Sequence, residues 1–207
     1  MPKLTTLFWD IGGVILSNGW DETTSQGAAR LFQFDLDDFE RRHQASFAEF
    51  ETGQITLDEY LNRSLFYRPR SFTKTELIAY VFAQSTEKPE TRAILDELTA
   101  TGEYWMAALN NEGLELNLYR IREFDLRRNL AAFFSSCYLG LRKPDEAFYR
   151  RALGITQRAP EECLFIDDRD TNVEGARRAG MRAIHFQNAA QLRVELAQHG
   201  VMAGAKA

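Results

Sequence analysis

Short apolar segments that alternate with helix-like segments constrain the fold of this sequence more than any other feature. Each apolar segment is expected to form a strand; the segments are residues 4–9, 104–109, 137–139, 163–166 and 181–186. Apolar residues recur at helical spacing in other segments, namely residues 89–101, 113–124, 145–153, 172–179 and 189–199. A helix between two strands crosses back over the sheet, so successive strands run parallel. The sequence therefore predicts an α/β fold with a doubly wound, mainly parallel sheet.

The alternation is interrupted once, directly after the first strand. Residues 17–88 hold no convincing strand, and their apolar residues recur at helical spacings. Eight of the fifteen phenylalanines fall in this stretch, as the packing of a small helical bundle would require. We therefore expect a Rossmann-like core, residues 1–16 and 89–207, with an all-helical insert, residues 17–88. The Ala- and Gly-rich tail, residues 201–207, is expected to fray.

Charge and cysteine content predict a soluble cytoplasmic protein. The 25 Lys and Arg residues and 30 Asp and Glu residues give a net charge of −5, which argues against nucleic acid or an anionic membrane as the main partner. No segment approaches the roughly 18 apolar residues that span a bilayer. Asp10 interrupts the apolar N-terminal stretch, which therefore fails as a signal peptide. Cys137 and Cys163 are too few for a disulfide framework and are expected to be reduced and mostly buried.

Polar residues end several of the expected strands. Ligands of a parallel sheet gather at the carboxyl ends of its strands, where loops and helix N-termini meet. The groups expected to converge there are three carboxylates, two amides and one ammonium: Asp10, Asn110, Asn111, Lys143, Asp167 and Asp168. Any one of them alone could be a helix cap or a solvated loop residue. Their placement at every relevant strand end predicts a functional site.

This set suits phosphoryl transfer through an aspartate. A carboxylate can attack phosphorus and form an acyl phosphate, which water then hydrolyses. Because the phosphate oxygens repel an anion, the attack requires neutralisation, and Mg²⁺ held by carboxylates supplies it. We expect Asp10 and one or both of Asp167 and Asp168 to bind Mg²⁺, with Lys143 as a second positive charge. Helix N-termini after Asp10 and Asn110 would add N–H donors for phosphate oxygens.

The same segments resemble the haloacid dehalogenase-like hydrolases in order and in spacing, over essentially the whole chain. Residues 8–14, with the sequence Phe-Trp-Asp-Ile-Gly-Gly-Val, are similar to the nucleophile motif of that family. Residues 106–111 stand at its second motif, the Lys143–Pro144 pair at its third, and residues 165–168 with Asn172 at its fourth. The helical insert resembles the family's cap, and residues 50–56 resemble a subgroup of small sugar-phosphate phosphatases.

The resemblance implies a role for each matching residue. Asp10 would be the nucleophile and a metal ligand, and the backbone carbonyl of Gly12 a further ligand. Asp168 would bind Mg²⁺ directly, and Asp167 directly or through water. Lys143 would hold both the phosphate and the Asp10 carboxylate. Asn110 stands where the family has Ser or Thr; its amide can still donate to a phosphate oxygen, and together with Asn111 it would help to bind the phosphate.

Gly12 departs from the family pattern. Phosphatases of this family usually carry a second Asp at this position, as general acid for the leaving group and then as base for water. Loss of a positioned acid and base typically lowers the rate on the order of 10² to 10⁴-fold. Some members of the similar subgroup also have Gly here, so Gly12 does not by itself indicate an inactive protein.

The function expected from the sequence is Mg²⁺-dependent hydrolysis of a small phosphomonoester, such as a sugar phosphate, through an aspartyl-phosphate at Asp10. The partner would be a small phosphorylated metabolite. Two alternatives stay open. The first is a metal-independent hydrolase of the dehalogenase type, because dehalogenases of the family also lack the second Asp. The second is a non-catalytic binding protein that retains the fold, a possibility raised by Gly12.

Overall fold

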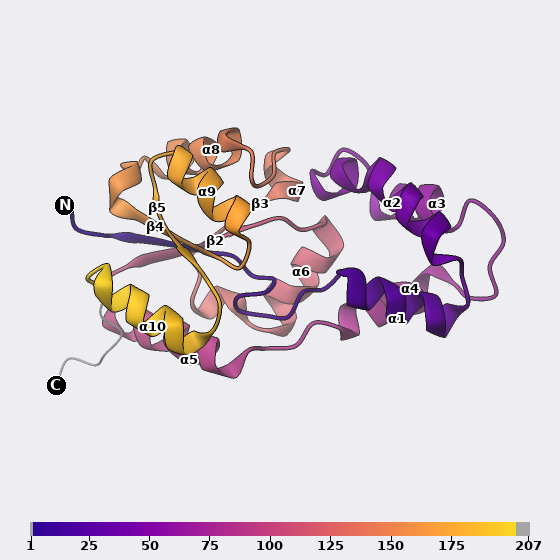
Figure 1. Cartoon of the computed structure of the whole chain (residues 1–207), viewed down its shortest axis with the longest axis horizontal. Helices are drawn as coiled ribbons and strands as arrows, with labels where there is room; N and C mark the ends of the chain where they lie inside the picture. The colour runs from indigo at the N-terminus through magenta and orange to yellow at the C-terminus, as the bar shows by residue number, and fades with distance from the viewer. Residues whose placement is uncertain (1, 202–207) are drawn as a thin grey trace.

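A five-stranded parallel sheet forms the centre of the protein (Figure 1). The structure is a computed structural model that describes residues 2–201. The strand order is β3-β2-β1-β4-β5, and every neighbouring pair is parallel. The strands are β1 (Thr6–Trp9), β2 (Trp105–Asn110), β3 (Ala132–Ser135), β4 (Cys163–Asp167) and β5 (Arg182–His185). The α/β class and the parallel sheet predicted from the sequence are confirmed.

The third strand lies earlier in the chain than predicted. The strand expected at residues 137–139 is wrong: β3 is Ala132–Ser135, and residues 137–139 belong to the short helix α7 (Ser136–Leu139). Pairing with β2 explains the difference, because Phe133 and Phe134 align with Ala108 and Leu109. The chain then turns at once, and Gly140 ends α7 in the left-handed region with a φ of 66°. An apolar run of three residues could not distinguish a strand from one helical turn.

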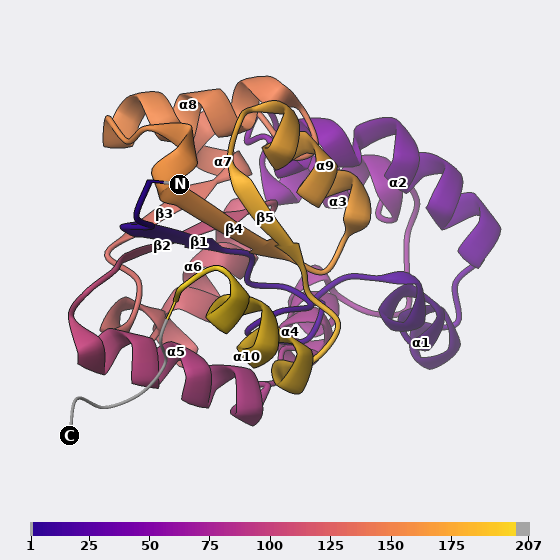
Figure 2. The ribbon, with the colours of Figure 1, turned by 60° about the vertical axis from the view of Figure 1, so that its left-hand side comes forward.

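Helices cover both faces of the sheet (Figure 2). One face packs against α5 (Pro89–Thr101), α6 (Leu114–Glu123) and α10 (Ala189–Gln198), and the other against α8 (Glu146–Thr156) and α9 (Asp170–Arg178). Single turns, η1 (Leu126–Arg128) and η2 (Pro160–Glu162), precede β3 and β4. Side chains alternate along β1, so Leu7 and Trp9 belong to the core between the sheet and α5, α6 and α10, whereas Phe8 belongs to the core between the sheet and α8 and α9.

The C-terminal tail is only partly described. Val201 is buried in the core on the face of the sheet that α5, α6 and α10 cover, so this residue does not fray. The rest of the expected frayed segment, residues 202–207, lies outside the described residues.

The insert after β1 is a bundle with its own core. Its helices are α1 (Glu22–Phe32), α2 (Leu36–Glu51), α3 (Leu57–Ser64) and α4 (Lys74–Ala83). Capping boxes start two of them: Thr56 with Glu59 at α3, and Thr73 with Glu76 at α4. The core is rich in aromatic residues, among them Phe34, Phe39, Phe47, Phe50 and Tyr60. Seven of the eight phenylalanines of this stretch therefore pack as the sequence predicted, whereas Phe82 stacks on Tyr119 of α6. We refer to this bundle as the cap.

Arg120 of α6 joins the two connections between core and cap. The residue is 1% exposed. Its Nη2 donates to the Ser17 carbonyl at 2.9 Å and its Nε to Ser85 Oγ at 3.0 Å. Its Nη1 donates to Glu112 Oε2 at 2.7 Å. Ser17 N also donates to the Thr86 carbonyl at 2.8 Å, which pairs the connections with each other. A single core side chain thus fixes where the cap is attached.

The end of α2 contacts the core directly. Ser136 Oγ at the start of α7 donates to the carbonyl of Glu51 at 2.6 Å. Gly53 has a φ of 71°, and a Cβ on it would lie 2.4 Å from the Cys137 carbonyl oxygen. Only a glycine allows the backbones to approach this closely.

We expect Arg120→Met to lower the free energy of unfolding by about 3–5 kcal/mol, because it removes the hydrogen bonds of the buried guanidinium and leaves the partly buried Glu112 carboxylate without its partner. Urea denaturation measures the change. Arg128→Met is the matched control: Arg128 pairs with Asp96 at 2.9 Å but its side chain is 54% exposed, so its loss should cost less than about 1 kcal/mol. Equal effects of the two substitutions would contradict the importance of the Arg120 contacts.

Candidate active site

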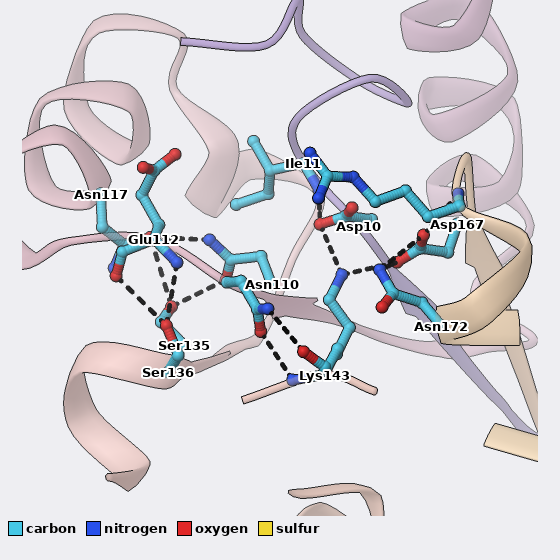
Figure 3. A network of polar contacts seen from close by, with 12 residues as sticks. Asp10, Ile11, Asn110, Glu112, Asn117, Ser135, Ser136, Lys143, Asp167 and Asn172 are labelled. Carbon is cyan, nitrogen blue, oxygen red and sulfur yellow. Dashed lines mark hydrogen bonds and ion pairs between the residues drawn. The ribbon is translucent and has the colours of Figure 1, made fainter. Parts of the chain in front are cut away.

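Lys143 stands at the centre of the polar groups that the sequence placed at the strand ends (Figure 3). Its Nζ lies 2.9 Å from Asp10 Oδ1 and 2.6 Å from Asp167 Oδ2. Asp10 directly follows β1, Asp167 ends β4, and Lys143 lies in the loop after α7. All three are buried. Burial alone would lower the pKa of Lys143, but the charges of the two carboxylates raise it above its usual range, so the ammonium is retained.

Asp10 is oriented through one of its carboxylate oxygens. Its Oδ1 accepts the Ile11 N–H at 2.8 Å in addition to the contact with Lys143. Its own N–H donates to the Ile166 carbonyl at 2.9 Å, which continues the pairing with β4. Burial raises the pKa of Asp10 well above its usual value; the Lys143 charge opposes this effect, and Asp167 adds to it.

Asp167 has a full set of hydrogen-bond donors. Besides Lys143, it accepts the Arg169 N–H at 2.8 Å and the Asn172 amide at 2.9 and 3.1 Å. Burial alone would raise the pKa of Asp167, but the Lys143 charge and these hydrogen bonds lower it below the usual range. Asp167 is therefore ionised, and it balances the charge of Lys143.

The three carboxylates fit a magnesium ion. One oxygen each of Asp10, Asp167 and Asp168 lie within 4.8 Å of one another. Hard oxygen donors of this kind, with room for water, are what Mg²⁺ prefers. Burial and the charge of Asp167 raise the pKa of Asp168, as expected for like charges held together without a cation. Gly13 makes this possible, because with a φ of 78° its Cβ would lie 2.0 Å from Asp168 Oδ2.

The two asparagines after β2 have separate contacts. Asn110 donates to Asn117 Oδ1 at 3.1 Å and accepts from Ser135 Oγ at 2.8 Å, so both ends of its amide are engaged inside the core. Asn111 donates to the Lys143 carbonyl at 3.0 Å and accepts the Lys143 N–H at 2.8 Å. Asn111 therefore holds the backbone of Lys143 in place. This positioning contact was not expected from the sequence.

Gly12 places no carboxyl at the position where phosphatases of the family usually carry a second Asp. A Cβ there would lie 3.2 Å from Asn18 Oδ1 and 3.4 Å from Arg120 Nη1. Two further carboxylates line the same cavity: that of Glu51 is buried, and that of Glu112 is partly buried, with its side chain 16% exposed. Burial raises the pKa of Glu51 to about 7 and that of Glu112 above its usual value. Neither residue was identified from the sequence, because a lone Glu in a helix or loop is usually a surface residue.

A cavity of about 150 Å³ extends from Asp10 into the cap. Its core end is polar, with Lys143, Arg142 and Asn172 in the lining. Its cap end is lined mainly by apolar and aromatic side chains, including Trp20, Phe47, Phe50, Leu57, Ile78 and Val81. The cavity therefore joins a charged site to an apolar chamber.

Among the described residues, no helix is long and apolar enough to cross a bilayer.

The family of this protein follows from its sequence as well as from its fold. The model of the haloacid dehalogenase-like hydrolases matches residues 4–180, so the chain belongs to that family. It is 32% identical over 162 residues to flavin mononucleotide hydrolase 1 of Arabidopsis thaliana, covering 78% of this chain and 65% of that protein's length. It is 29% identical over 157 residues to a sesquiterpene phosphatase of Aspergillus oryzae, covering 72% and 76%.

Solved structures show the same fold. A haloacid dehalogenase family enzyme of Bacteroides thetaiotaomicron superposes with a TM-score of 0.78 at 17% identity, over 90% of this chain and 95% of that one. Another structure of that enzyme is a complex with magnesium and inorganic phosphate. The resemblance found in the sequence is thus confirmed, including the helical cap after the first strand.

We expect Gly13→Ala to abolish Mg²⁺ binding, because the new methyl group displaces the Asp168 carboxylate and strains the backbone. Thermal melting with increasing Mg²⁺ measures this: the wild type gains stability with the ion and the variant does not. Gly154→Ala is the control, since nothing lies within 4 Å of a Cβ there. An unchanged Mg²⁺ response in Gly13→Ala would exclude Asp168 from the metal site.

Proposed function

We propose that the protein is a Mg²⁺-dependent phosphatase that forms an aspartyl-phosphate at Asp10. The observation that supports this proposal most directly is the buried Asp10 carboxylate, held by Lys143 beside Asp167 and Asp168 at the floor of a cavity. A carboxylate nucleophile, a fixed cation and a Mg²⁺ site are the groups that phosphoryl transfer through aspartate requires.

Each residue of the site would have a defined task. The two contacts on Asp10 Oδ1 fix the carboxylate, and we assign the attack on phosphorus to Oδ2. Lys143 would hold a phosphate oxygen while it neutralises Asp10, and Asn111 would keep Lys143 in place. Asp10, Asp167, Asp168 and the Gly12 carbonyl would hold Mg²⁺, which supplies positive charge to the phosphate oxygens. Water would then hydrolyse the aspartyl-phosphate. Backbone N–H groups after Asn110 are the phosphate donors that we propose there, since the Asn110 amide is engaged elsewhere.

The cavity favours the phosphate ester of an apolar alcohol. A sugar hydroxyl buried without a partner costs about 1–3 kcal/mol, whereas each buried methylene contributes about 0.8 kcal/mol. In the cap, the Tyr60 hydroxyl is within 2.6 Å of the His43 ring and is thus already bonded. The sugar phosphate expected from the sequence is therefore the less favoured substrate. A sesquiterpene phosphate, on which one relative acts by name, is the ester of an apolar alcohol, whereas flavin mononucleotide, on which the other acts, joins a large ring system to a hydroxylated chain.

We expect Asp10→Asn to lower hydrolysis of 4-nitrophenyl phosphate with Mg²⁺ by at least about a thousandfold, because the nucleophile is lost. Phosphate release is the measurement. Asp170→Asn, at an aspartate whose side chain is 70% exposed, should leave the rate unchanged. Equal turnover by wild type and Asp10→Asn would remove Asp10 from the mechanism. Hydrolysis of a haloacid that persists in excess chelator would instead support the metal-independent, dehalogenase-type alternative.

Val81→Thr tests the apolar chamber. The substitution preserves shape and places a hydroxyl in the lining, so we expect kcat/KM for octyl phosphate to fall about tenfold. The value for glucose 6-phosphate should not fall. Val194→Thr is the matched control, because Val194 is 58% exposed on α10. A preference of the wild type for glucose 6-phosphate over octyl phosphate would exclude an apolar substrate while leaving the phosphatase chemistry intact.

A further inference from the structure

The proposed phosphatase reaction needs a proton donor that position 12 does not supply. An alkyl alcohol leaves as an unstable alkoxide unless a proton reaches its oxygen during bond breaking, and a positioned acid contributes on the order of 10² to 10⁴ in rate. Gly12 has no side chain, and its surroundings are an amide and a guanidinium, those of Asn18 and Arg120. Neither is an acid at neutral pH. The donor must therefore come from another residue that lines the cavity.

Glu51 is placed to reach the cavity although it belongs to the cap. It is the last residue of α2 and is 6% exposed. Its carbonyl accepts from Ser136 Oγ at 2.6 Å, and the same hydroxyl accepts the Glu112 N–H at 2.9 Å. Glu51 is thus tied to the loop that follows β2. Its Oε2 lies 3.0 Å from Nε of Arg142, the residue before Lys143. The side chain is therefore held between two loops of the core.

Glu112 and Glu115 are further carboxylates in the lining of the cavity. Glu112 is the one that the Ser136 hydroxyl joins to Glu51, and its contacts exclude it as the donor. Its Oε2 accepts from Arg120 Nη1 at 2.7 Å. Arg120 is fully buried and has no other carboxylate partner among the described residues. Protonation of Glu112 would leave that guanidinium uncompensated, which is costly in a buried site. Glu51 instead pairs with Arg142, whose side chain is 36% exposed and can be neutralised by water and salt.

We propose that Glu51 is the general acid and base of this enzyme and supplies from the cap the function that is absent at position 12. This inference rests on the proposed phosphatase function. In the first step, Asp10 forms a bond to phosphorus, the ester P–O bond breaks, and the Glu51 carboxyl gives its proton to the departing oxygen. In the second step, the Glu51 carboxylate takes a proton from water as that water attacks the aspartyl-phosphate. Inorganic phosphate and free Asp10 result, and Glu51 is protonated again.

The charges around Glu51 are consistent with both steps. Burial raises its pKa to about 7, and the nearby Glu112 raises it too, whereas Arg142, Lys143 and Arg169 lower it. A group that titrates near neutrality is protonated in part and ionised in part, which suits an acid that later acts as a base. Since the first step needs the protonated form, the rate for a poor leaving group should decline above about pH 7.

The test compares Glu51→Gln with the wild type on two phosphate esters. For octyl phosphate, whose alkoxide needs a proton, we expect kcat/KM, which covers only the steps through departure of the alcohol, to fall on the order of 10² to 10⁴-fold, and its decline above neutral pH to disappear. For 4-nitrophenyl phosphate, whose phenolate leaves without help, kcat/KM should fall by less than about tenfold, because loss of the base in the second step, which both esters share, lowers kcat and not kcat/KM. A purely structural role would lower both rates alike. Equal losses on the two esters would therefore overturn the proposal.

Two further variants complete the experiment. Glu49→Gln is the matched control, because Glu49 lies on the same helix and pairs with Arg63 at 2.7 Å, with a side chain 46% exposed. It should leave both rates unchanged. Gly12→Asp combined with Glu51→Gln should recover at least about tenfold of the octyl phosphate rate, because a carboxyl returns to position 12. If the double variant folds and responds to Mg²⁺ but its octyl phosphate rate does not recover, the result would contradict the proposal that Glu51 replaces the acid absent at position 12. If the wild type itself releases no phosphate with Mg²⁺, the phosphatase function fails rather than the role of Glu51.

Discussion

The ammonium of Lys143 between two buried carboxylates is the interaction on which the rest of the site depends. Asp10 and Asp167 come from neighbouring strands, and their charges would repel each other without a cation between them. Loss of one partner of such a buried set typically costs about 3–5 kcal/mol, because the remaining charges stay uncompensated. The same contact orients Asp10, so the group that stabilises the site also positions the proposed nucleophile. The Asn111 amide also fixes the backbone of Lys143, because it bonds both the N–H and the carbonyl of that residue.

Much of the fold could be predicted because its strands are apolar and its polar residues follow them. Asp10, Asp167 and Asp168 meet as expected, since adjacent parallel strands bring their carboxyl ends to one edge. Cys137 to Leu139 could not be assigned correctly, because one helical turn and a short strand have the same apolar composition. Periodicity needs a longer segment before it distinguishes the two.

The roles of Glu51 in the cap and of Arg120 at its attachment could not be predicted from the sequence, for a different reason. Glu51 is separated from Lys143 by more than ninety residues, and nothing in its local pattern says that it is buried beside Arg142. Arg120 also looks like an ordinary surface residue of an amphipathic helix, yet it is fully buried among the two connections to the cap. In both cases the tertiary packing, rather than the local sequence, decides the role.

The docking of α2 on α7 has a consequence for any movement of the cap away from the core. Ser136 and the Glu51 carbonyl form part of the contact that holds the cap against the core. Any motion that lifts α2 from α7 withdraws Glu51 together with the cap, whereas Asp10 and Lys143 remain on the core. The proposed nucleophile and its proposed proton donor would therefore lie together only while α2 is docked on α7. Water that entered such an opened cavity would meet Asp10 and Lys143 without Glu51. Proton transfer by Glu51 would therefore be restricted to the state in which the cap encloses the substrate.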